Sequence, residues 1–68
     1  MATRTVFHVL PAVRGWKVQA SDGARPLSLA DDRHQALNFA LSVRRHDDAI
    51  VVHDDEGEIV EVLPRLML

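Results

Sequence analysis

The chain has 68 residues, enough for one small domain, 1–68, with a modest core. Its 8 Lys and Arg against 10 Asp and Glu give a formal net charge of -2, so no overall positive field attracts a nucleic-acid backbone. The sequence contains no cysteine, which excludes disulfide bonds and thiolate metal sites. Oligomerisation is the remaining common way to support so small a core.

The first ten residues carry a single arginine and a brief apolar run that ends at Pro11. Such a run is shorter than a signal peptide or a membrane span requires. We therefore expect a soluble, cytoplasmic protein with no membrane association.

Residues 5–10 are predicted to form the first strand, because β-branched and aromatic side chains dominate them and Pro11 follows. Both alternating sets of side chains in this strand are apolar. That pattern is typical of a strand that is covered on both faces.

Residues 15–20 are predicted to form the second strand, with Trp16 and Val18 facing inward and Lys17 and Gln19 facing outward. The turn that follows contains an Asp-Gly pair, which favours a tight hairpin. A short third strand is expected within residues 25–30.

The pattern with the clearest helical period covers residues 32–45. Asp32 is a natural N-cap, and Gln35 three residues later completes a capping box. Apolar side chains recur at steps of three and four residues, which places them on one face. They are Ala36, Leu37, Ala40, Leu41 and Val43.

Two further strands are predicted after the helix, in residues 49–53 and 58–63. The acidic loop between them ends at Gly57, which suits a positive φ. Pro64 stops the last strand, and residues 64–68 form an apolar C-terminal tail.

These elements predict an α+β domain: an antiparallel sheet of four to five strands with one helix packed on one face. Nine residues are expected in its core. They are Trp16, Val18, Ala36, Leu37, Ala40, Leu41, Ile50, Val52 and Ile59.

In order and spacing, five segments of the chain resemble the small bacterial family called domain of unknown function 2188. They are residues 8–11 (His-Val-Leu-Pro), 15–18 (Gly-Trp-Lys-Val), 32–40, 50–53 (Ile-Val-Val-His) and 57–59 (Gly-Glu-Ile). The resemblance implies a compact strand-helix-strand module without an established activity, so it supplies no catalytic residues. The apolar tail departs from the family pattern.

The titratable residues give no pattern of an enzyme or a metal centre. The four histidines, at 8, 34, 46 and 53, lack the spacing of a zinc site, and the acidic loop lacks the register of a calcium loop. No serine has the context of a nucleophile. We therefore expect no catalytic activity, no cofactor and no metal.

A basic patch near the helix is one candidate interface, for nucleic acid. Its members are Arg33, Arg44, Arg45 and His46. Trp16 would offer a stacking face to a base. Against this reading, basic residues near a helix C-terminus also stabilise the helix itself.

Surplus apolar residues form the second candidate, a homodimer interface, because one helix covers only one face of a sheet. The candidate residues are Phe7, Val9, Val51, Val60, Val62, Leu66, Met67 and Leu68. Alternatively, the tail folds back over its own sheet. Two functions therefore remain: a non-catalytic interaction or structural module, acting as a homodimer or through a protein partner, and a small nucleic-acid-binding protein.

Overall fold

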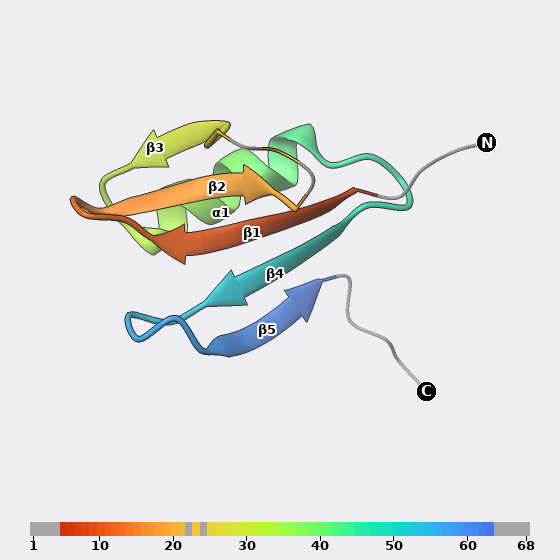
Figure 1. The fold of residues 1–68 in the computed structure, drawn as a ribbon. Helices are drawn as coiled ribbons and strands as arrows, with labels where there is room; N and C mark the ends of the chain where they lie inside the picture. The colour runs from red at the N-terminus through yellow and green to blue at the C-terminus, as the bar shows by residue number, and fades with distance from the viewer. Residues whose placement is uncertain (1–4, 22, 24, 64–68) are drawn as a thin grey trace.

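The structure, a computed structural model, describes residues 5–21, 23 and 25–63. It contains five strands and one helix, which confirms the α+β fold (Figure 1). The elements are β1 (Val6–Pro11), β2 (Trp16–Ala20), β3 (Ser28–Ala30), α1 (Arg33–Val43), β4 (Ala49–His53) and β5 (Ile59–Leu63).

The five strands form one sheet in the order β3-β2-β1-β4-β5, so β1 lies at its centre. The pairs β1·β2, β2·β3 and β4·β5 are antiparallel, as expected for neighbours joined by turns. The pair β1·β4 is parallel, which makes the sheet mixed rather than wholly antiparallel. The physical reason is the connection: α1 returns the chain along one face of the sheet, so β4 runs in the direction of β1 (Figure 1).

Helix α1 begins at the predicted cap. The Asp32 carboxylate accepts the backbone N–H of Gln35 at 2.8 Å, and the Gln35 side-chain oxygen accepts the N–H of Asp31 at 3.2 Å. The return hydrogen bond thus goes to the residue before the cap and not to the cap itself. The helix ends at Val43, two residues earlier than predicted.

The core lies between α1 and one face of the sheet. Of the described residues, seven apolar ones are buried there: Phe7, Val9, Val18, Ala36, Ala40, Ile50 and Val52. The two helix positions are alanines four residues apart, which lets the helix backbone approach the strands closely. Trp16, Leu37 and Phe39 pack around this core and are partly buried.

Two predicted core residues are not in it. Leu41 is 45% exposed and Ile59 is 60% exposed. The helix contacts β1, β2 and β3 extensively, reaches β4 only slightly and does not extend over β5. Leu41 therefore lies beside the core, and Ile59 belongs to a strand that the helix leaves uncovered.

Candidate functional site

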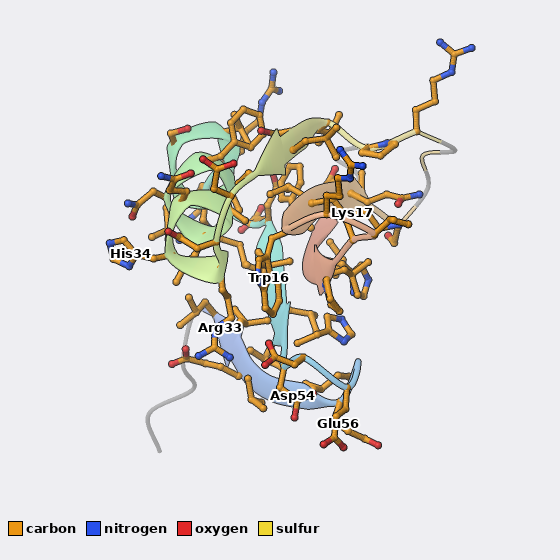
Figure 2. All side chains as sticks on the ribbon, turned by 90° about the vertical axis from the view of Figure 1, so that its left-hand side faces the viewer. Trp16, Lys17, Arg33, His34, Asp54 and Glu56 are labelled. Atoms are coloured by element: carbon orange, nitrogen blue, oxygen red, sulfur yellow. The ribbon has the colours of Figure 1, made fainter. Side chains whose placement is uncertain are left out.

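The face of the sheet opposite α1 carries the surplus apolar residues, and we call it the open face. Strand register defines it, because paired residues share a face and alternate residues along a strand return to it. Its members are Val6, His8, Leu10, Lys17, Gln19, Leu29, Ala49, Val51, His53, Ile59 and Val62. Figure 2 shows Lys17 on the side of the sheet away from the helix.

Apolar side chains on the open face are accessible to water along both edges of the sheet. Leu29 of β3 is 71% exposed, and Ile59 and Val62 of β5 are 60% and 50% exposed. Val6, Leu10 and Val51 between them are half-buried. The predicted surplus of apolar surface is therefore present on β1, β4 and β5 and on the edge strand β3, with Lys17 and Gln19 of β2 between β3 and β1.

Several residues predicted for a dimer interface lie elsewhere. Phe7 and Val9 are buried under the helix, because they alternate with the open-face residues of β1. Val60 is the extra residue where the register shifts between β4 and β5, and it lines a hollow on the helix side with Leu37. Val51 and Val62 face the open side. The tail residues Leu66, Met67 and Leu68 lie outside the described residues.

Two histidines from distant parts of the sequence meet on the open face. Parallel pairing of β1 with β4 places His8 Nδ1 3.0 Å from His53 Nε2. The other ring nitrogen of His53, Nδ1, lies 3.0 Å from the carbonyl oxygen of Gly57. His53 is 8% exposed, whereas His8 is half-buried.

The hydrogen bonds determine the tautomers of this pair. A carbonyl oxygen only accepts, so His53 Nδ1 carries a proton and donates to Gly57. In the neutral ring, His53 Nε2 is then an acceptor, and His8 Nδ1 must donate to it. The pKa of His8 lies below its usual value of 6.5, first because burial disfavours the charged ring and second because His53 repels it.

The four residues of the predicted nucleic-acid patch do not gather in one place. Arg33 is the first residue of α1, and the other three follow its end, about 16 Å away for an eleven-residue helix. Arg44 donates to the carbonyl oxygens of Asp48 and His46. Fully exposed His46 lies 3.9 Å from an Asp47 carboxylate oxygen. The side chains of Arg44 and His46 therefore contact their own loop.

Arg33 instead belongs to a small hollow at the end of the sheet. Its guanidinium lies 5.8 Å from the centre of the Trp16 ring, within the range of a cation–π contact. Acidic residues of the β4–β5 loop, Asp54, Asp55 and Glu56, form the opposite wall of this hollow of about 410 Å³ (Figure 2). The nearby carboxylates oppose the approach of a phosphate, and the arginine already covers the ring on which a base would stack.

Sequence reasoning missed the contact between His8 and His53, although it placed both on strands. The contact depends on the parallel pairing of β1 with β4, which local sequence patterns do not predict. Among the described residues, no three histidine or carboxylate side chains are grouped closely enough to hold a metal ion. Within the same residues, no helix has the length and apolar character of a membrane span.

Comparisons of the chain with protein-family models, with curated proteins and with solved structures find no match in any of the three.

Proposed function

We propose that the chain is a non-catalytic interaction module that functions as a homodimer, with the open faces of two sheets packed together. The observation that carries this proposal is the exposure of Leu29, Ile59 and Val62 beside three half-buried apolar residues on one face. Burial is worth about 25 cal/mol per Å² of apolar surface. Covering this face therefore gives a substantial gain to a domain whose stability is only about 5–15 kcal/mol.

The strand order suits a second copy of the same chain. A two-fold axis parallel to the strands, through the centre of the open face, stacks β1 on β1 and β3 of one copy on β5 of the other. The register places Leu29 level with Lys17 and Leu10, and Ile59 level with His53, at the same end of the sheet. Leu29 of one copy therefore faces Ile59 of the other copy across the interface. These are the two most exposed apolar residues of the open face.

Charge also favours this arrangement. The same rotation stacks β2 of one copy on β4 of the other, which brings Lys17 to the end of β4. The loop that starts there carries four carboxylates, at positions 54, 55, 56 and 58. Opposite charges at the rim of an interface favour association and fix its register.

A non-catalytic role is supported by the partners of the histidines. His8 and His53 bind each other, and His46 lies beside Asp47. Neither contact places an imidazole against a serine or threonine hydroxyl, the arrangement that activates such a hydroxyl as a nucleophile.

We also propose membership of the bacterial family called domain of unknown function 2188, on the residues that carry the resemblance. A cytoplasmic location is part of the same proposal, and the absence of cysteine is compatible with it.

Two matched variants test the interface. Val62→Glu places a carboxylate on the open face, whereas Leu41→Glu places one on the helix at similar exposure, 45% against 50%. We expect light scattering after size-exclusion chromatography to show a dimer for the wild type and for Leu41→Glu, and a monomer for Val62→Glu. Equal masses for all three chains would contradict the proposed interface.

The alternative, nucleic-acid binding, is tested by titrating labelled single-stranded and duplex DNA and RNA at low and moderate salt. Phosphate contacts release counterions, so binding through arginines weakens as salt rises. We expect no salt-dependent binding. Salt-sensitive binding that is lost on replacing both Arg44 and Arg45 with alanine would favour the alternative instead.

A further inference from the structure

The His8–His53 pair lies on the open face, which is the proposed homodimer interface, so the following inference rests on the proposed function. Its place in that interface follows from topology. His8 is in β1, the central strand, and the two-fold axis described above stacks β1 on β1. The two copies of His8 therefore lie close together at the centre of the dimer, where water is excluded.

The pair has one vacant site for a proton. Three of its four ring nitrogens take part in the chain of hydrogen bonds that runs from His8 Nδ1 through His53 to the Gly57 carbonyl oxygen. The fourth, His8 Nε2, keeps its lone pair when both rings are neutral. The first proton can bind there without breaking a hydrogen bond of the pair. A second proton would have to displace the bond between the rings.

We propose that uptake of one proton by the His8–His53 pair of each copy dissociates the homodimer. In the separated chain, His8 is half-buried and its charged ring keeps access to water. In the dimer, two imidazolium rings would face each other across the axis, away from water, and both effects disfavour the charge. Protons therefore bind the monomer more tightly, and acidification shifts the equilibrium towards it.

Among the residues that the structure describes, the charged groups around the pair either also disfavour a charged His8 or are directed away from it. Lys17 of the neighbouring strand shares the open face, and the second copy brings its own Lys17 towards the end of β4, so both cations oppose a charged His8. Asp54 follows His53, but its carboxylate oxygen accepts the N–H groups of Glu56 and Glu58 and is turned into its own loop. The Glu58 carboxylate, at the far side of that loop, is exposed to solvent.

The direction of the pH dependence follows from the two states. The dimer holds its full stability where both states are neutral, above the usual histidine pKa of 6.5. It loses stability as the pH falls through the pKa of His8 in the separate chain, which lies below 6.5, because the monomer then binds protons that the dimer excludes. Two protons bind for each dimer that separates, so the dissociation constant can rise by up to about 100-fold per pH unit.

Sedimentation velocity at constant ionic strength, at about pH 7.5 and about pH 5.5, measures this equilibrium. For the wild type we expect a larger dissociation constant at the lower pH, with a slope that approaches about 100-fold per pH unit once the pH is below the monomer pKa of His8. His8→Asn should dimerise with little dependence on pH, because the amide nitrogen of asparagine replaces Nδ1 as donor and does not titrate. A chain with His34→Asn and His46→Asn should behave like the wild type, since both residues are exposed outside the open face.

The outcomes separate this inference from the proposed function. A wild type that is monomeric at both pH values overturns both. A dimer of equal strength at both pH values keeps the proposed function and overturns the role of the pair. An equal pH response in His8→Asn also overturns that role. Loss of the circular dichroism signal together with the dimer would mean unfolding rather than dissociation, and would overturn it too.

Nitrogen-15 NMR of the histidine rings tests the same inference in the wild-type chain. At about pH 7.5, His8 and His53 should both be neutral with the proton on Nδ1. On acidification, His8 Nε2 should be the first nitrogen of the pair to become protonated. A neutral His8 with its proton on Nε2 would contradict the proposed chain of hydrogen bonds.

Discussion

The Asp48 carboxylate accepts the backbone N–H of Thr5 at 3.0 Å, across 43 residues of sequence. Its other oxygen accepts the N–H of Arg45 at 2.9 Å. Asp48 therefore joins the start of β1 to the connection between α1 and β4. In return, the N–H of Ala49 donates to the carbonyl oxygen of Thr5 at 3.0 Å, where the parallel strands begin.

These contacts predict a loss of stability in acid. The pKa of Asp48 lies below its usual value of 3.8, mainly because the N–H groups of Arg45 and then Thr5 favour the ionised form. Because the pKa of Asp48 is lower in the folded protein than in the unfolded chain, the ionised carboxylate stabilises the fold above pH 3.8. This stabilisation is lost as the pH falls through the folded-state pKa. Urea denaturation over a pH series should show Asp48→Asn less stable than wild type at neutral pH, with the gap narrowing in acid. The matched control is Asp47→Asn, at an exposed neighbour; equal losses in the two variants would contradict this role of Asp48.

Alanine substitutions should distinguish the two glycines at positive φ. Gly15 and Gly57 both have φ of 85°. A Cβ at Gly15 would collide with the carbonyl oxygen of Ala30, whereas a Cβ at Gly57 meets open space. Gly57→Ala should cost about 1–2 kcal/mol of unfolding free energy, the backbone strain alone. Gly15→Ala should cost more than about 1 kcal/mol beyond that, measured by thermal or chemical denaturation.

Alanine substitutions at Ile50 and Leu41 should show different losses of stability, because Ile50 lies in the core and Leu41 lies beside it. Ile50 is fully buried, so Ile50→Ala should lower the free energy of unfolding by about 2–5 kcal/mol. Leu41 is nearly half exposed, so Leu41→Ala should cost about 1 kcal/mol or less. Similar losses at both sites in urea denaturation would mean that the helix lies differently on the sheet.

Sequence patterns predicted the elements well, because turn residues and alternation act locally. The bounds of β4 are those predicted, and α1 has the predicted N-cap, Asp32. The parallel pairing of β1 with β4 was not predicted, because it depends on the path of the chain over the sheet. The exposure of Leu41 was also missed, because helical period assigns a face but not how far the sheet extends beneath it.

The candidate site was predicted only in part for a related reason. An apolar face without cover was expected, but β1 is apolar on both sides, so alternation could not say which set faces the helix. Phe7 and Val9 are buried under the helix, whereas Val51 and Val62 lie on the open face, and their part in a dimer interface stays a prediction. The contact of His8 with His53 requires the sheet order, which the sequence patterns left open.

Sedimentation equilibrium of the wild-type chain at neutral pH tests the proposed homodimer most directly. Across the micromolar range, the weight-average mass should rise from the chain mass of 7.6 kDa towards twice that value and fit a monomer–dimer equilibrium. Val62→Glu should remain near the mass of one chain at the same concentrations. A wild type that stays at 7.6 kDa throughout the range would contradict the assignment of the open face as a dimer interface.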